Sequence, residues 1–271
     1  MRQASRRDII RYRREAVGER HMILRRLAHR IRVQDWTAVA IEFAMVVVAV
    51  YLGLQAANWN DDRRERALER SYLARIAQDV HSDVADMDEI IRVSAVRMAL
   101  LNEVLPKASG RALPDGFASA RGRVAIEAVP SYAETGSNDP GFALFILTPL
   151  EGNRSAYETL INAGAITGMR DLAALRSIQD YYAAVDKERH FEVGLEQNRD
   201  KLIDAERALG LSPVRPMSTD ELTTALAGNP ELLATAQNYW LYTNRHLKLM
   251  RELQAQAREL AGELDRRAAG S

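Results

Sequence analysis

The chain has 271 residues, enough for one or two modest domains, with a formal net charge of zero and no cysteine. The lack of cysteine excludes disulfides and thiol catalysis, and the neutral balance argues against nucleic-acid binding, which typically needs an excess of basic residues. Aromatic residues make up only 6% of the chain while Ala, Leu and Arg are abundant, so a mainly α fold is expected.

Residues 1–35 form a strongly basic arm. They hold eleven Arg against four acidic residues. Because Arg and Lys are enriched on the cytoplasmic side of membrane spans, this arm predicts a cytoplasmic N-terminus. Two interpretations of residues 6–32 stay open: an amphipathic helix lying on anionic lipid, or a topology signal with no further role.

Residues 36–59 predict a transmembrane helix. The segment is 24 residues long, and Glu42 is its only charged side chain. About 20 apolar residues are enough to cross a bilayer as a helix. A basic region of about 35 residues is too long for a cleaved signal peptide, so a retained anchor is expected. We therefore expect a protein of the bacterial inner membrane, with residues 60–267 in the periplasm.

Tryptophans bracket the apolar segment. Trp36 and Trp59 stand at its two ends, where aromatic side chains favour the interface between lipid and water. Asn58 and Asn60 flank the second tryptophan and complete an interfacial motif with both aromatics. These amides are expected either to make polar contacts at the lipid surface or to mark a surface for a partner.

Glu42 shares a helix face with small residues. At 100° per residue, Ala49, Gly53 and Ala56 fall within about 40° of it. Small residues four positions apart let two helix backbones approach closely in lipid. A charged carboxylate at the bilayer centre costs at least ~2.5 kcal/mol, so this face is expected to contact another helix. The alternative is that Glu42 reaches the nearby cytoplasmic surface or is protonated, with the small residues incidental.

Helical periodicity continues beyond the apolar segment. Apolar residues at helical spacing predict one helix that reaches about Leu105, with Pro106 as a stop signal. Residues 106–155 hold five of the eight Pro and six of the fifteen Gly, which predicts an irregular insert. Within it, residues 123–129 and 142–148 are compatible with strands or with extended core-packing segments.

The C-terminal half predicts helices joined by turns. Two long helices are expected, and with the N-terminal helix they predict an antiparallel bundle. A shorter helical segment at 154–166 is expected to cap the membrane-distal end of this bundle or to pack beside it. The other expected helices cover 171–209, 219–227 after an N-cap at Ser218 or Thr219, and Asn229-Pro230 to Arg267.

Three stretches carry a resemblance to a known family. They are "IEFAMVVVAVYLGLQAANWNDDRRER" (41–66), "ERSYLARIAQDV" (69–80) and "YETLINAGAITGMRDLAALRSIQDYY" (157–182). On these residues the chain resembles the uncharacterised DUF6090-type family of bacterial single-pass membrane proteins. The basic arm and residues 106–150 lie outside the resemblance. It implies a topology, with one span before an extramembrane region, and no activity.

Catalytic, cofactor-binding and metal-ligating residues are not indicated by any motif. No pair of the five His has the spacing of metal ligands on a helix. His190 and His246 lie near the apolar stripes of the expected bundle, which favours structural burial. Tyr157, Tyr181 and Tyr182 are likewise expected to pack in the core rather than to line a pocket.

Three aspartates follow helical spacing. Asp79, Asp83 and Asp86 share one face of the expected first helix. A divalent cation or a basic partner is one interpretation, but a solvated face is the commoner outcome of such a pattern and is expected here.

The sequence therefore favours a non-enzymatic, membrane-anchored interaction or scaffold subunit that assembles through its transmembrane helix and periplasmic bundle. The expected partners are the lipid bilayer and either a second copy or another membrane protein, with no nucleic acid and no cofactor. The alternative is a periplasmic ligand-sensing bundle that signals through a partner at the Arg-rich arm.

Overall fold

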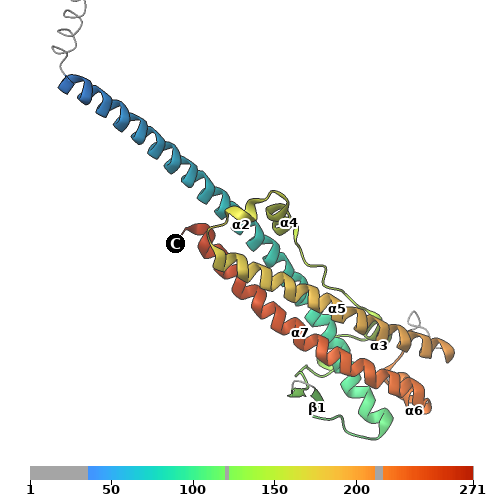
Figure 1. Ribbon diagram of the computed structural model, residues 1–271. Coiled ribbons are helices and arrows are strands. Elements are labelled where there is room, and N and C mark those ends of the chain that lie inside the picture. The colour runs from blue at the N-terminus through green and yellow to red at the C-terminus, as the bar shows by residue number, and fades with distance from the viewer. Residues whose placement is uncertain (1–35, 120–121, 211–215, 271) are drawn as a thin grey trace, which may run out of the picture. The chain divides into compact units, whose positions relative to one another are not determined.

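The structure, a computed structural model, describes residues 36–119, 122–210 and 216–270, so the basic arm lies outside the described residues. The chain is mostly helical, which confirms the predicted mainly α class (Figure 1). The elements are α2 (Trp36–Ser109), β1 (Gly116–Ser119), β2 (Gly122–Ala125), η1 (Ala133–Thr135), α3 (Pro140–Phe145), α4 (Ser155–Asn162), η2 (Ala165–Gly168), α5 (Leu172–Ala208), α6 (Thr219–Gly228) and α7 (Pro230–Ala269).

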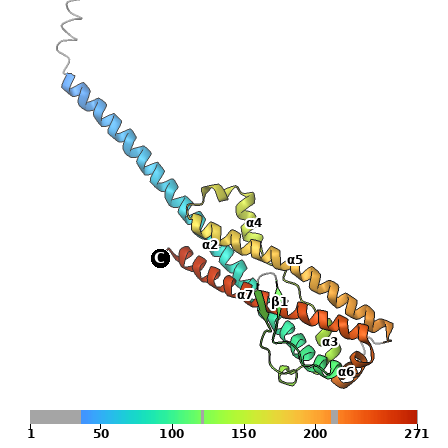
Figure 2. The ribbon, with the colours of Figure 1, turned by 60° about the horizontal axis from the view of Figure 1, so that its bottom comes forward.

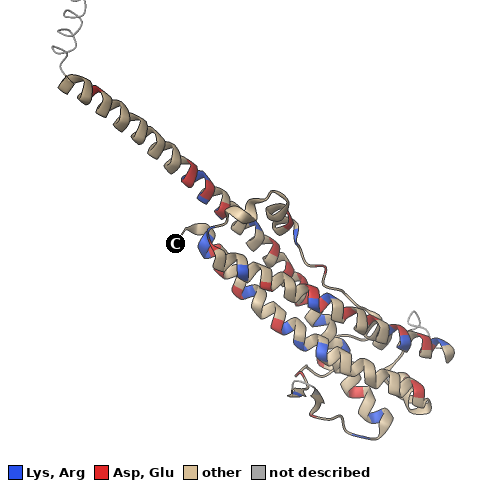
Figure 3. Cartoon of the chain, in the orientation of Figure 1, with Lys and Arg blue, Asp and Glu red and all other residues tan. Residues whose placement is uncertain are grey.

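The chain divides into two units after Arg64, and α2 contributes to both. In the first unit, α2 contains an 18-residue window with a mean hydropathy of 2.2, of which none is buried. Figure 3 shows this part of α2 almost without charged residues. By length and composition it is able to cross a membrane, and among the described residues it is the one helix that meets this criterion.

The end of α2 differs from the prediction. Pro106 lies inside the helix, which continues to Ser109. Proline lacks the N–H that would bond back along the helix, so a stop is the usual result. Here Val104 and Leu105 are fully buried in the core, and their packing holds the last turn in place.

The second unit is built on α2, α5 and α7. Figures 1 and 2 show α5 and α7 side by side. His81 of α2 contacts Asp265, whereas the indole of Trp240 donates to Asn102, so α7 runs in the opposite chain direction to α2. Each of the three helices buries one apolar stripe against the other two, which removes those side chains from water.

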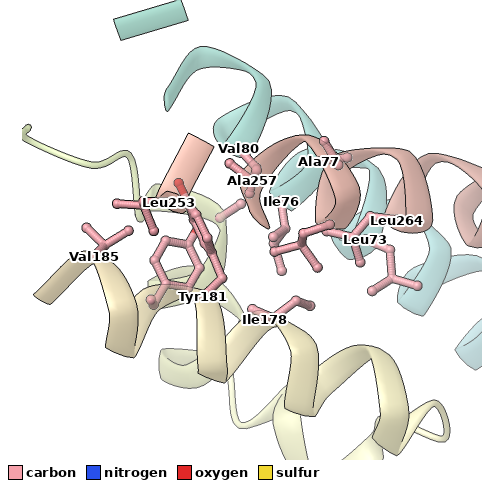
Figure 4. Packing of buried hydrophobic residues seen from close by; sticks show 14 of the residues in the cluster. Leu73, Ile76, Ala77, Val80, Ile178, Tyr181, Val185, Leu253, Ala257 and Leu264 are labelled. Carbon is pink, nitrogen blue, oxygen red and sulfur yellow. The ribbon is translucent and has the colours of Figure 1, made fainter. Parts of the chain in front are cut away.

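One apolar cluster occupies the half of this unit that includes the start of its α2 segment. The side chains from the three helices point toward one another in Figure 4. Each buried Leu, Ile or Val contributes about 1.5–3 kcal/mol relative to an exposed one. The labelled members are Leu73, Ile76, Ala77 and Val80 from α2, Ile178, Tyr181 and Val185 from α5, and Leu253, Ala257 and Leu264 from α7.

A second apolar cluster occupies the other half. It joins the last turns of α2 to the second half of α5, to α6 and to the first half of α7, with α3 packed against them. Its members include Met98, Leu101, Leu105, Leu144, Leu195, Leu202, Leu222, Leu226, Leu232 and Leu247.

Helix starts follow local capping chemistry. Ser218 accepts a hydrogen bond from the backbone N–H of Glu221, whose carboxylate accepts one from the N–H of Ser218, forming a capping box. Asn229 caps α7, with Pro230 in the first turn, and Asp171 caps α5. Of the two predicted N-caps, Ser218 is correct, and the predicted start at Asn229-Pro230 is confirmed.

The region 106–155 contains short elements. β1 and β2 form an antiparallel pair in which Phe117 faces Val124. The expected extended segment at 142–148 begins instead as the end of α3, because Asp139 accepts from the N–H of Phe142 and Pro140 fits the first turn of a helix.

The short helix α4 packs beside α2 and α5. The backbone N–H of Ala156 donates to Asp79 of α2, and the ring of Tyr157 stacks on Tyr182 of α5 at 4.8 Å. These contacts lie in the half of the unit nearer to Glu65. Of the two expected placements, the one beside the bundle is correct and the cap at its far end is wrong.

Candidate functional site

The residues of the predicted interface all lie on the first unit's part of α2. Glu42, Ala49, Gly53 and Ala56 are exposed, and a Cβ added at Gly53 would meet no atom within 4 Å. Because the segment is helical, the four positions share one side of the helix as predicted. No other described residue of this unit covers that side, so it is available for lipid or for another helix.

The interfacial motif is also exposed. Trp36, Asn58, Trp59 and Asn60 have no cover from other described parts of the chain. The guanidinium of Arg63 lies 5.8 Å from the Trp59 ring centroid, a cation–π geometry that places a charge beside the indole. An aromatic ring with a cation one turn further on suits a boundary between apolar and aqueous surroundings.

Two of the three aspartates are buried, so the predicted solvated face is wrong for Asp79 and Asp83 and holds only for Asp86. Asp83 accepts from the backbone N–H of Asn153 at 2.6 Å, and Asp79 accepts from the N–H of Ala156 at 2.8 Å. These carboxylates satisfy the backbone donors of the segment that leads into α4, and this tertiary role overrides the surface pattern.

Burial and hydrogen bonding act in opposite directions on Asp83. Desolvation raises its pKa, while the bonds from Asn153 and from the phenol of Tyr181 lower it, and burial is the larger effect. Burial also raises the pKa of Tyr181 and of Tyr182, so both phenols keep their protons. The expected core packing of these two tyrosines is confirmed.

A layer of buried polar side chains lies near the boundary between the two apolar clusters. It contains residues that the sequence did not single out, except for His246. Its members are Ser94 and Arg97 from α2, Glu188 and Glu192 from α5, and Thr243, Asn244 and His246 from α7.

A serine, a histidine and a glutamate form a row in this layer. Ser94 Oγ lies 3.2 Å from His246 Nδ1, and His246 Nε2 lies 3.1 Å from Glu192 Oε1. Burial lowers the pKa of His246 despite the adjacent carboxylate, so the imidazole is neutral. A proton on Nε2 satisfies both contacts, because the ring then donates to Glu192 and accepts from the Ser94 hydroxyl.

In its residue types this row resembles a catalytic triad of serine, histidine and carboxylate. Its burial argues against catalysis. Ser94 is only 2% exposed, so a substrate carbonyl cannot reach its oxygen in this conformation. Both carboxylate oxygens of Glu192 also accept from the backbone N–H of Leu150 at 3.1 Å. The row therefore ties α2, α5 and α7 to the segment before α4. The predicted burial of His246 is confirmed, whereas His190 is exposed on the outer face of α5 and its predicted burial is wrong.

Arg97 and Glu188 are buried without ion-pair partners among the described residues. The guanidinium of Arg97 donates to the carbonyl of Ile146 and lies 5.4 Å from the Tyr239 ring centroid, while its Nε and Nη1 have no partner there. Desolvation lowers the pKa of Arg97. Burial, assisted by the neighbouring Glu192, raises the pKa of Glu188 to about 8. The layer is thus electrostatically costly, and the surrounding apolar contacts must offset that cost.

A signal for part of this layer was present in the sequence. Glu188 and Glu192 stand three and seven residues after Val185, on the apolar stripe of α5, where a charged side chain is unexpected. Ser94 and Thr243 carry no such signal, because small hydroxyl residues are common on either face of a helix.

Two open pockets lie in the second unit. The larger, about 460 Å³, lies beside the start of α4 and is lined by polar side chains of α2, including Tyr72, Arg75, Gln78 and Asp79. The smaller, about 340 Å³, is formed by the start of this unit's α2 segment, the cap of α5 and the end of α7. No group of three or more His, Cys, Asp or Glu able to hold a metal occurs in the part of the chain that the structure describes.

Comparison with protein-family models, curated proteins and solved structures finds no match to this chain. The resemblance to the DUF6090-type family therefore stays a prediction.

Proposed function

We propose that the protein is a non-enzymatic, single-pass membrane subunit that assembles through the apolar part of α2 and through an antiparallel periplasmic bundle. The observation that carries this proposal is the full exposure of an apolar window long enough to span a bilayer. Isolated in water, such a surface would aggregate, so a membrane is its natural solvent.

Assembly is supported by the composition of one face of this helix. Glu42 shares that face with Ala49 and Gly53, whereas bulky Val and Leu side chains cover most of the remainder. Small residues permit close backbone contact in lipid, and a facing helix offers the carboxyl group a partner that lipid lacks. The proposed partner is a second copy of the chain or another membrane protein.

The test compares matched substitutions on opposite faces of the helix. Ala49→Leu enlarges the proposed face, and Ala44→Leu makes the same change about 160° around the helix from Glu42. We expect the full chain, extracted in mild detergent, to lose its oligomeric mass or its bound partner with Ala49→Leu and with Glu42→Leu, and to keep it with Ala44→Leu. A monomer without a partner before any substitution overturns the proposal.

The excess of Arg in residues 1–35 sets the proposed orientation in the bacterial inner membrane. The N-terminus lies in the cytoplasm and the second unit lies in the periplasm. Because the chain has no cysteine, single cysteines report topology cleanly. A membrane-impermeant maleimide added to intact cells with a permeable outer membrane should label Ala163→Cys and spare Ser5→Cys. The reverse pattern overturns the orientation.

A ligand-sensing bundle is the second candidate, and the pocket beside α4 favours it. The pocket is open to solvent and combines the carboxylate of Asp79 with the guanidinium of Arg75. A small molecule retained by the purified chain, and lost on Arg75→Ala, supports this candidate over a purely scaffolding role.

A further inference from the structure

The larger pocket, beside the start of α4, contains two opposite charges that do not pair with each other. Arg75 and Asp79 stand four residues apart on α2 and both line the pocket. Side chains at this spacing are neighbours on one face of a helix. The Arg75 side chain nevertheless makes no ion pair or hydrogen bond with any residue that the structure describes. The pocket therefore presents a cation and an anion separately to a molecule that enters it.

The anionic side of the pocket is held in place. Asp79 is only 8% exposed, and its Oδ2 accepts from the backbone N–H of Ala156 at 2.8 Å and from the hydroxyl of Ser155 at 3.3 Å. Its Oδ1 accepts no hydrogen bond within the described ranges. A largely buried carboxylate oxygen without a donor is unfavourable, and an ammonium group in the pocket would supply one.

The cationic side of the pocket is Arg75, which is exposed. Its planar guanidinium offers five donors, and the geometry of a carboxylate matches two of them at once. Asp79 is the one acidic side chain in the pocket lining. A divalent cation prefers several oxygen ligands, so a single carboxylate beside an arginine suits it poorly.

The remaining lining side chains are neutral and mostly polar. Gln78 and Ser82 are exposed, and their side chains make no hydrogen bond with other described residues. The hydroxyl of Thr159 donates to the carbonyl of Ser155, so its lone pairs stay open to a donor. Such a lining suits a neutral polar group better than a third charge or a large apolar one. The volume, about 460 Å³, falls in the range typical of small-molecule sites.

We propose that this pocket binds a free α-amino acid with a neutral polar side chain. Its carboxylate would contact Arg75 and its ammonium would contact Oδ1 of Asp79. An α-amino acid carries both charges on one carbon, and the Cβ atoms of residues four apart on a helix are only about 5–6 Å apart, so both side chains can converge on one molecule. This inference rests on the second candidate function, the ligand-sensing bundle, and does not depend on membrane anchoring.

The experiment measures binding of L-glutamine and of two analogues to the full chain in mild detergent by titration calorimetry. Glutaramic acid is L-glutamine without its ammonium group, and γ-aminobutyramide is L-glutamine without its carboxylate. We expect saturable binding of L-glutamine. Each analogue should bind at least about tenfold more weakly, because each has lost its hydrogen bonds to a charged side chain.

Two substitutions assign each charge of the ligand to its residue. Arg75→Gln should remove the preference for L-glutamine over γ-aminobutyramide and keep the preference over glutaramic acid. Asp79→Asn should do the reverse, and its amide oxygen can still accept from Ala156, so the start of α4 keeps its contact. Arg207→Gln is the matched control, because Arg207 is exposed in the last turn of α5 and outside the pocket lining. It should leave all three affinities unchanged.

Equal affinity of the unsubstituted chain for L-glutamine and either analogue overturns the proposal, and so does a failure to bind L-glutamine, L-asparagine and L-serine. Affinities that neither Arg75→Gln nor Asp79→Asn alters place the ligand elsewhere and also overturn it. Native mass measurement of the chain purified from cells separates this inference from the ligand-sensing candidate. Another kind of small molecule, retained by the chain and lost with Arg75→Ala, overturns only the amino-acid class. A chain that retains nothing and binds none of the amino acids contradicts both.

Discussion

The carboxylate of Asp83 accepts a hydrogen bond from the phenol of Tyr181 at 2.7 Å, which joins α2 to α5 inside an apolar cluster. The other Asp83 oxygen accepts from the backbone N–H of Asn153. One side chain therefore connects two long helices to the segment that precedes α4.

Replacing Asp83 should destabilise the second unit. Asp83→Ala leaves a buried phenol and a backbone N–H without their acceptor, at a cost of about 2–4 kcal/mol. Tyr181→Phe removes only one of these bonds and should cost about 1 kcal/mol. Denaturant unfolding of the full chain in detergent measures both. Asp86→Ala is the control, because Asp86 lies one turn away and is exposed. An equal loss for Asp83 and Asp86 contradicts the assignment.

Stability should fall as pH rises through the range set by Glu188. Its pKa is about 8 in the folded chain, against an ordinary value of 4.5, because burial disfavours the charged form. The contribution of the protonated Glu188 carboxyl to the free energy of unfolding is complete below pH 4.5. It is lost as the pH rises to about 8, by about 1 kcal/mol per pH unit. Glu206, with a pKa raised by burial to about 7, adds a loss of the same sign.

Glu188→Gln tests this dependence directly. A neutral amide has no proton to lose, so the variant should show a flatter fall in denaturant midpoint between pH 5 and 8. The exposed Glu259 provides the control, since Glu259→Gln should leave the slope as it was. An unchanged slope in Glu188→Gln shows that this carboxyl is already ionised at neutral pH.

How much the sequence could predict differs between local and long-range features. The sequence predicts helix starts at Ser218 and Asn229 because capping is decided by residues a few positions apart. The contacts of His246 with Ser94 and Glu192 join residues 152 and 54 positions apart, and a single sequence contains no record of such pairing. The burial of Asp79 is not predictable from the sequence for the same reason.

The Ser94 row should be inert toward covalent serine-hydrolase probes. Its hydroxyl is buried between helices, so a fluorophosphonate has no path to Oγ while the bundle is folded. We expect no labelling of the native chain and a stability loss of about 1 kcal/mol for Ser94→Ala, from one lost hydrogen bond. Labelling that disappears in Ser94→Ala would instead reveal an open conformation with access to the row.

Arg97 should be replaceable by an apolar residue of similar length. Its buried guanidinium makes one contact with a carbonyl and one with an aromatic ring. These two contacts offset only part of the free energy that it costs to remove the charge from water. We expect Arg97→Met to leave the unfolding midpoint unchanged or higher, and Arg97→Ala to lower stability by about 2–4 kcal/mol through lost packing. A large loss in Arg97→Met shows that the charge itself has a favourable partner.

Gly152 should tolerate no side chain, because its loop contacts the buried face of α5. It adopts a φ of +69°, and a Cβ there would lie 2.9 Å from Val185 Cγ1. Val185 is fully buried and β-branched, so it has no free rotamer into which to move.

Gly136, with a φ of +72° and open space around it, shares the backbone strain without the clash. Gly152→Ala should therefore cost about 1–3 kcal/mol more than Gly136→Ala. Adding Val185→Ala to Gly152→Ala should recover part of that difference, because it removes the clashing methyl group. The unsubstituted chain, the single variants Gly152→Ala and Val185→Ala, and the double variant form a double-mutant cycle, measured by denaturant unfolding. Equal costs at the two glycines, with no recovery, show that the segment before Asn153 moves away from α5 at little cost.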